Sequence, residues 1–150
     1  MASNKTRIQD AQQAYLTVLN FLKRAFQKGA RKVNAREWDS FQEELEHSKL
    51  SPEAATVVGF WTMENLASHK PSRVQPRALQ EFEAQIFPGA VHSEFVEAVQ
   101  FGMVSEIQGE SILEDFLEIS SFEIPKERML KSLSQMWAKN VQGYQMVRVS

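Results

Sequence analysis

The residues best suited to metal binding or proton transfer in this chain of 150 residues are three histidines, His47, His69 and His92, in separate segments. No two of them have the four-residue spacing that puts a pair of ligands on one helical face. Glu43 lies four residues before His47. On a helix this spacing is far more typical of a solvent-exposed ion pair than of half a metal site. We therefore expect no metal and no cofactor.

Carboxylates gather between residues 110 and 118, where a catalytic pair could be sought. They are Glu110, Glu114, Asp115 and Glu118. Their spacing places them on the polar side of one amphipathic helix, where charged residues normally face solvent. The sequence also has no glycine-rich phosphate loop and no Gly-x-Ser-x-Gly motif, and no serine has a histidine at a motif distance. We therefore expect a protein that is not an enzyme.

The composition, 43% hydrophobic and 24% charged, is typical of one globular domain and too apolar for a disordered chain. The absence of cysteine excludes a disulfide scaffold and a cysteine zinc site, and it favours a reducing compartment. The longest apolar run, Val57–Trp61, is far shorter than the roughly 20 residues that span a bilayer. We expect a cytoplasmic protein with no membrane partner.

Charge is distributed unevenly along the chain. Residues 1–36 carry a net charge of +7, residues 37–124 carry −13, and residues 125–150 carry +4. The first region contains a basic band, made of Lys23, Arg24, Lys28, Arg31, Lys32 and Arg36. Such a band can bind a phosphate backbone, lie against the acidic middle of the chain, or stay solvated. Because the whole chain is not strongly basic, we hold nucleic-acid binding as the alternative function.

Apolar residues recur at three- and four-residue steps and predict an all-α fold of about seven short helices in one compact domain, residues 1–150. The expected helices cover about 10–28, 34–47, 51–66, 76–86, 90–101, 108–119 and 125–141. Residues 1–9 are expected to form a flexible tail. Residues 141–150 are expected to form a loosely packed tail, with a short extended segment possible.

Helix boundaries are indicated by capping residues. Asn34 and Ser51 are expected to cap the second and third helices, and Gly29 and Gly102 to end the first and fifth. The last helix has the strongest apolar period. Its stripe consists of Met129, Leu130, Leu133, Met136, Trp137 and Val141. We expect Trp137 to be the most buried member of that stripe.

A series of short patterns in the second half of the chain suggests a family. The stretches are Ser72-Arg73-Val74, Glu81 and Phe82, Gly102-Met103-Val104-Ser105, Glu110, Ile112-Leu113-Glu114, Phe116-Leu117, Ile124-Pro125 and Met129-Leu130-Lys131. Together they resemble the Smg family, small cytoplasmic bacterial proteins with no established function. The helices that contain Val18-Leu19 and Trp61 look like the family's opening and tryptophan-containing helices. The resemblance covers roughly 120 residues and implies a mainly helical fold.

Some apolar residues fall outside the expected core faces and are the candidate partner-binding residues. They are Phe60, Met63, Phe101 and Met103. Phenylalanine and methionine are common on partner surfaces, although the same residues can fill a second core layer. With no catalytic set in the sequence, we expect a protein–protein interaction module. Its partner is another protein of unknown identity, and no small-molecule ligand is expected.

Overall fold

The computed structural model describes residues 3–29, 32–48, 50–69, 86–119 and 123–149. These residues form an all-α domain, as the sequence predicts, and contain no strand. The six helices within them are α1 (Ser3–Lys28), α2 (Ala35–His47), α3 (Pro52–Ser68), α5 (Gly89–Gln100), α6 (Glu106–Ile119) and α7 (Lys126–Val149). The additional helix expected at about 76–86 lies, apart from Ile86, outside the described residues.

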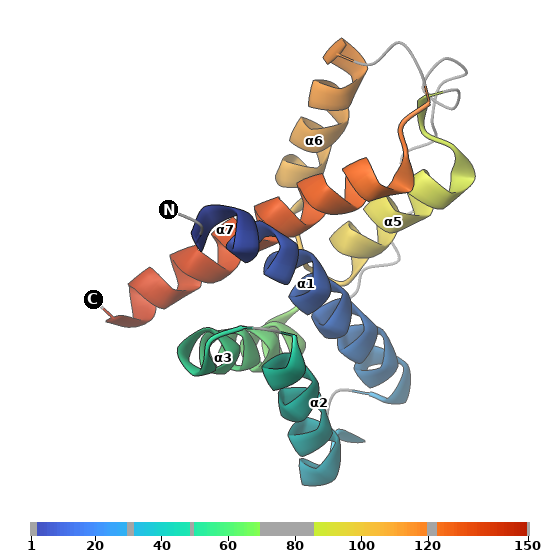
Figure 1. Cartoon of the computed structure of the whole chain (residues 1–150). Coiled ribbons are helices and arrows are strands. Elements are labelled where there is room, and N and C mark those ends of the chain that lie inside the picture. Colours follow the sequence, from blue (N-terminus) through green and yellow to red (C-terminus); the bar gives the residue numbers. More distant parts are fainter. Residues whose placement is uncertain (1–2, 30–31, 49, 70–85, 120–122, 150) are drawn as a thin grey trace.

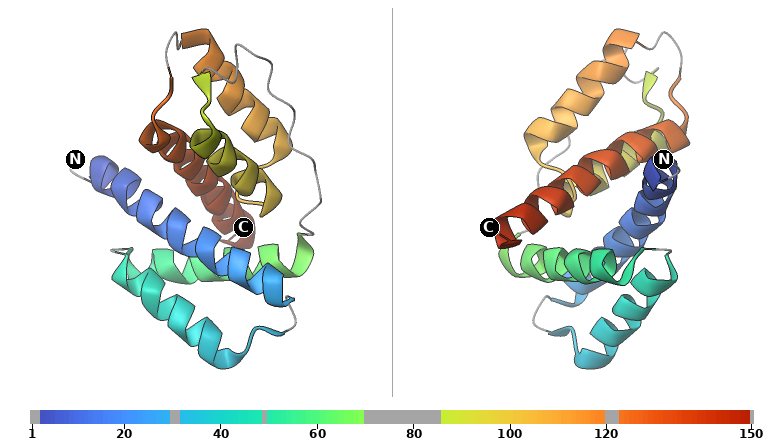
Figure 2. Two further views of the ribbon diagram at one scale, coloured as in Figure 1. Left: turned by 90° about the vertical axis from the view of Figure 1, so that its right-hand side faces the viewer. Right: turned by 60° about the vertical axis from the view of Figure 1, so that its left-hand side comes forward.

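The two longest helices, α1 and α7, pack against each other and cross near the middle of the molecule (Figure 1). α2 and α3 lie on one side of this crossing, and α5 and α6 lie on the other (Figure 2). α7 also packs against α3, α5 and α6, so it connects the two halves of the fold. No helix in the described part of the chain is both long and apolar enough to cross a bilayer.

The caps predicted for α2 and α3 are confirmed. The side chain of Asn34 accepts a hydrogen bond from the backbone N–H of Glu37 at 2.9 Å. The Ser51 side chain accepts one from the backbone N–H of Ala54 at 3.1 Å, and Pro52 occupies the first turn. Each cap satisfies a donor that has no partner within its helix.

Gly102 ends α5 in a left-handed conformation, with φ of +78°. The backbone N–H of Met103 donates to the carbonyl oxygen of Ala98 at 2.9 Å. The backbone N–H of Gly102 donates to the carbonyl oxygen of Val99 at 3.2 Å. This pair of bonds defines a Schellman motif, in which the residue after the glycine packs back onto the helix. Met103 is therefore fully buried. The expectation that Met103 lies outside the core is wrong for this reason.

Both ends of the chain are more helical than expected. α1 begins at Ser3, where a flexible tail over residues 1–9 was expected; these residues contain no glycine or proline that would interrupt a helix. α7 continues to Val149, so the possibility of a short extended segment is wrong for residues 141–149. The alternation of apolar and polar residues there is too short to outweigh continuation of an established helix.

The core is centred on α1 and α7. Trp137 of α7 has its ring 6.0 Å from that of Tyr15 and 5.9 Å from that of Trp61, both edge-to-face. The predicted stripe of α7 does face the core, but Trp137 is not its most buried member. Its exposed fraction is 2%, whereas Met129 and Leu133 are at 0%, because a tryptophan ring is so large that it is rarely covered completely.

Candidate functional site

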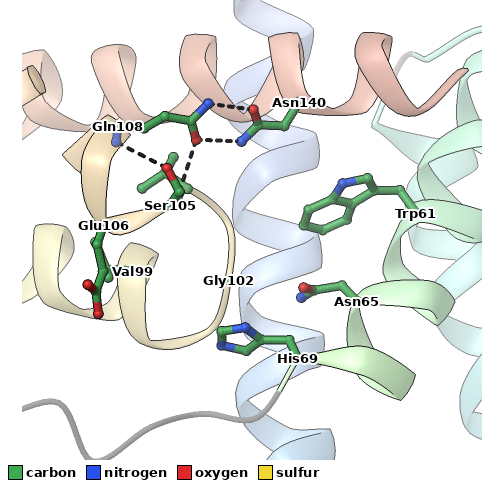
Figure 3. Close-up of a pocket in the computed structure, with 10 residues that line it drawn as sticks. Trp61, Asn65, His69, Val99, Gly102, Ser105, Glu106, Gln108 and Asn140 are labelled. Atoms are coloured by element: carbon green, nitrogen blue, oxygen red, sulfur yellow. Dashed lines mark hydrogen bonds between the residues drawn. The ribbon is translucent and has the colours of Figure 1, made fainter. Parts of the chain in front are cut away.

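A polar pocket of about 450 Å³ lies where the end of α3 meets α7 and the turn between α5 and α6 (Figure 3). Its lining residues are Trp61, Asn65, His69, Val99, Gly102, Val104, Ser105, Glu106, Gln108 and Asn140. It contains one of the three histidines singled out by the sequence and brings a carboxylate and a tryptophan to the same space. The hydrogen bonds of these side chains therefore decide whether they are free to bind a ligand or to transfer a proton.

One side chain of α3, Asn65, and the residue that follows the helix, His69, hold the end of α5. Nε2 of His69 lies 2.8 Å from the carbonyl oxygen of Gln100, and the side-chain amide of Asn65 donates to the carbonyl oxygen of Phe101 at 3.0 Å. Carbonyls in the last turn of a helix have no partner within the helix, so these bonds cap α5 from a distant segment. His69 and Asn65 therefore have a structural role at this pocket.

Asn140 of α7 fastens the other side of the turn. Its side-chain amide donates to the carbonyl of Met103 at 3.1 Å and to Oε1 of Gln108 at 2.9 Å. The amide of Gln108 donates back to Oδ1 of Asn140 at 2.7 Å (Figure 3). Ser105 and Gln108 also form a reciprocal capping box at the start of α6. Most polar groups of the pocket are thus used to hold one turn in place.

The other two histidines, His47 and His92, lie on separate helices, α2 and α5. His47 and Glu43 are both exposed on α2, as expected of a solvated pair. The ring of His92 stacks on Phe95 at 6.3 Å, and partial burial lowers the pKa of His92. Among the described residues, no three His, Cys, Asp or Glu side chains are placed to hold a metal ion.

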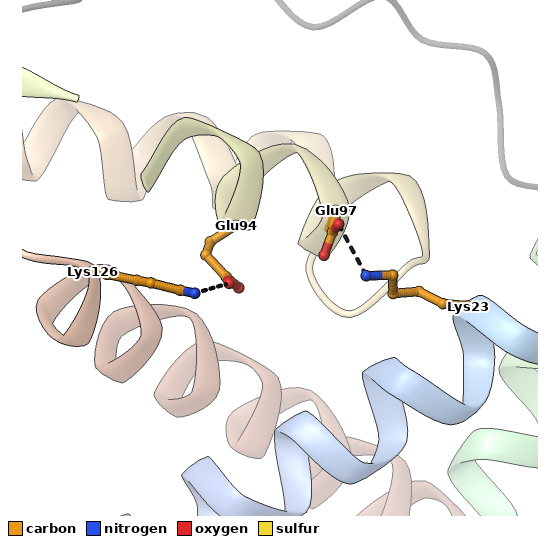
Figure 4. Close-up of polar contacts among 4 residues, drawn as sticks. All are labelled: Lys23, Glu94, Glu97 and Lys126. Atoms are coloured by element: carbon orange, nitrogen blue, oxygen red, sulfur yellow. Dashed lines mark hydrogen bonds and ion pairs between the residues drawn. The ribbon is translucent and has the colours of Figure 1, made fainter. Parts of the chain in front are cut away.

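Two lysines of the basic band form ion pairs within the chain. Nζ of Lys23 lies 3.0 Å from Oε1 of Glu97 on α5, and Nζ of Lys28 lies 3.0 Å from Oε1 of Glu37 on α2 (Figure 4 for the first pair). These contacts correspond to the intramolecular option, in which the band lies against the acidic middle of the chain. They reduce the positive charge that Lys23 and Lys28 can offer to a phosphate backbone.

The other described residues of the basic band are exposed, and carboxylates lie beside some of them. Arg24, Lys32 and Arg36 are exposed, and Arg31 lies outside the described residues. A groove of about 460 Å³ between α1 and α2 is lined by Arg24, Lys28 and Arg36. Glu37 and Glu44 line the same groove. The described part of the band therefore does not form a face free of carboxylates, which a phosphate-binding surface would need.

The four apolar candidates have different environments. Phe60 and Met63 are exposed on α3, with exposed fractions of 54% and 49%. Phe101 is half-buried, and its ring stacks on that of Phe26 at 6.0 Å. Met103 is fully buried. Only Phe60 and Met63 are accessible enough to form the centre of a partner surface.

A buried polar cluster between α1, α5 and α7 was not predictable from sequence patterns. Three buried atoms have no hydrogen-bond partner among the described residues: the hydroxyl of Tyr15, Oε2 of Glu94 and Nε1 of Trp137. The other carboxylate oxygen of Glu94 pairs with Nζ of Lys126 at 3.3 Å (Figure 4). These residues are far apart in the chain and none belongs to a motif, so only helix packing reveals the cluster.

Comparison with protein-family models, curated proteins and solved structures finds no match to this chain. The resemblance to the Smg family stays a prediction.

Proposed function

We propose that this chain is a non-enzymatic helical module that binds another protein through the exposed face of α3. The observation that carries the proposal is the pair Phe60 and Met63, which stand three residues apart on one helical face and are each about half exposed. Large apolar residues at this spacing are the usual anchors of helix-mediated recognition. The resemblance to the Smg family and the lack of cysteine support a bacterial, cytoplasmic setting for this role.

α3 carries large apolar side chains on its exposed face as well as on the face that packs against the core. The exposed face is therefore available to a partner. Ala55, Val58 and Leu66 face the core, where α3 packs against α1, α2 and α7. The fold therefore needs only one face of α3, and the apolar residues on the other face contribute little to the core. Maintaining two large apolar side chains in water is more consistent with binding than with folding.

The charge around this face indicates the chemistry of the partner. α3 contains no lysine or arginine, and Glu53 is exposed in its first turn. A partner surface that fits it would offer apolar side chains bordered by basic ones. We therefore propose a protein partner with an apolar and basic contact surface.

The proposal is tested by affinity capture from nuclease-treated lysate, followed by quantitative mass spectrometry and binding measurements with the captured protein. Replacing Phe60 and Met63 together by serine is expected to reduce binding by at least about tenfold, because both anchors are lost. Thr56→Ser, on the same exposed face, is the matched control and should leave binding unchanged. Unfolding by urea verifies that each variant is folded.

Equal binding by the double variant and wild type would contradict the proposal. So would capture that disappears after nuclease treatment, since it would point to a nucleic-acid partner. In that case neutralising Lys28, Arg31 and Lys32 together should weaken binding for any sequence and flatten its dependence on salt. That alternative receives less support here, because Lys28 is paired with Glu37 and two carboxylates line the groove beside it.

A further inference from the structure

A second surface lies at the other end of the molecule, in the groove between α6 and α7. The groove has a volume of about 390 Å³. Its apolar part is formed by Ile112 and Phe116, which are buried, by half-buried Met136, and by Ile119. Ile119 is 69% exposed, so a large apolar side chain is left facing water at the groove.

The α7 edge of this groove is basic. Arg128, Lys131 and Lys139 line it, and all three are exposed. None forms an ion pair within the described structure; the guanidinium of Arg128 lies over the ring of Phe116 at 5.7 Å. Among the described residues, Asp115 is the one carboxylate that lines the groove, on the α6 side. In contrast with Lys23 and Lys28, these cations remain available to a partner.

The dimensions of the groove match a short helix. The lining residues of α6 from Ile112 to Ile119 follow helical three- and four-residue steps, and those of α7 extend from Arg128 to Lys139. At 1.5 Å per residue the α7 edge is about 17 Å long, which corresponds to roughly three turns of a bound helix. Helices bind such grooves through apolar residues spaced by three, four and seven positions.

We propose that the groove between α6 and α7 binds an acidic amphipathic helix of a partner protein. Apolar residues of that helix cover Ile119 and Met136, and carboxylates on its flank pair with Lys131, Lys139 and Arg128. A nucleic-acid backbone fits the groove less well, because it has no apolar side chains to cover Ile119. This surface is separate from the exposed face of α3 and opposite to it in charge, so the two proposals stand or fall independently.

The test measures binding of the full chain to a fluorescein-labelled synthetic helix by fluorescence anisotropy. The probe is an alanine-based peptide of about four turns, with leucines on one face and glutamates on the α7-facing flank. The expected result is saturable binding that weakens as salt is raised, because exposed charges are screened. A peptide with lysine in place of each glutamate, and one with the leucines scrambled, should not bind.

Matched variants locate the binding site. Lys131→Glu with Lys139→Glu should weaken binding by at least about tenfold, whereas Lys32→Glu with Arg36→Glu, the same change in net charge, should leave it within about twofold. Ile119→Ala should weaken binding, and Ile107→Ala should not, because Ile107 is exposed on the same helix but does not line the groove. All of these positions are exposed, so the variants are expected to fold.

Other occupants give different results, each of which would overturn the proposal. Equal losses in both charge-reversed pairs would show non-specific attraction. Binding to duplex DNA or to vesicles rich in anionic lipid, with none to the acidic helix, would identify another class of ligand. Concentration-dependent dimers in sedimentation that disappear in the Lys131/Lys139 variant, again without peptide binding, would identify a second copy of the chain as the occupant.

Discussion

Nε2 of His69 lies 2.8 Å from the carbonyl oxygen of Gln100, although the two residues are 31 positions apart. A carbonyl oxygen only accepts hydrogen bonds, so Nε2 carries the proton in this contact. The bond joins the end of α3 to the end of α5, and α3 and α5 belong to opposite sides of the crossing formed by α1 and α7. His69 thus supplies a link between the two halves of the fold rather than a catalytic base.

Replacing His69 by alanine is therefore expected to lower the free energy of unfolding by about 1–2 kcal/mol, since a carbonyl at the end of α5 loses its partner. Faster amide hydrogen exchange should appear at Gly102 and Met103. Urea unfolding and hydrogen exchange measure both effects.

His69→Gln is the matched control, because its side-chain amide can still donate a hydrogen bond. It should keep part of the stability that the alanine variant loses. If both variants matched wild type, His69 would be free of any structural role, and the pocket would become a more attractive ligand site.

The helices were largely predictable because their signals are local. Asn34 and Ser51 cap helices through contacts only three residues along the chain, and the stripe of α7 follows helical periodicity. The burial of Met103 was not predictable from local signals. Its burial depends on the Schellman motif at Gly102 and on packing against other helices.

The candidate sites were only partly predictable, because they depend on which helices meet. Sequence placed Lys23 in a basic band, but Glu97, which neutralises it, lies 74 positions away. The groove between α6 and α7 also depends on tertiary packing, because its lining residues Ile119 and Lys131 come from two different helices. Charge and hydropathy patterns identify the faces of each helix, and tertiary packing decides which faces remain accessible.

Trp137→Ala tests the central position of α7. We expect a loss of about 3–5 kcal/mol in the free energy of unfolding, from lost apolar burial and an unfilled cavity next to Tyr15 and Trp61. Lys139→Ala, at an exposed position of the same helix, should change it by less than about 0.5 kcal/mol. An unchanged urea midpoint for Trp137→Ala would show that α7 is peripheral to folding.

The lowered pKa of His92 predicts a pH dependence of stability. Partial burial disfavours the charged imidazole, so the folded-state pKa lies below the ordinary value of 6.5 and the unfolded chain binds this proton more readily. This contribution to stability is present above pH 6.5 and is lost as the pH falls below it. His92→Gln should reduce the decline in the free energy of unfolding that urea unfolding measures below pH 6.5. Ser93→Ala changes an exposed neighbour and should leave that decline as in wild type. The same decline in both variants would exclude His92 as its source.

Tyr15 offers a test of the buried polar cluster. Its hydroxyl is buried without a hydrogen-bond partner among the described residues, and burial, followed by the charges of Glu94 and Glu97, raises its pKa. Tyr15→Phe keeps the ring against Trp137 and removes the hydroxyl, so the free energy of unfolding should stay constant or rise by about 1 kcal/mol.

The same substitution has a distinct signature at alkaline pH. Because the folded-state pKa of Tyr15 is above the unfolded value of 10.0, ionisation favours the unfolded chain once the pH exceeds 10. Wild type should lose stability there, and Tyr15→Phe should lose less. Tyr144→Phe, a change of the other tyrosine, controls for the general effect of removing a phenol. Destabilisation of Tyr15→Phe near neutral pH by more than about 1 kcal/mol would instead mean that the hydroxyl has a hydrogen bond in the folded protein.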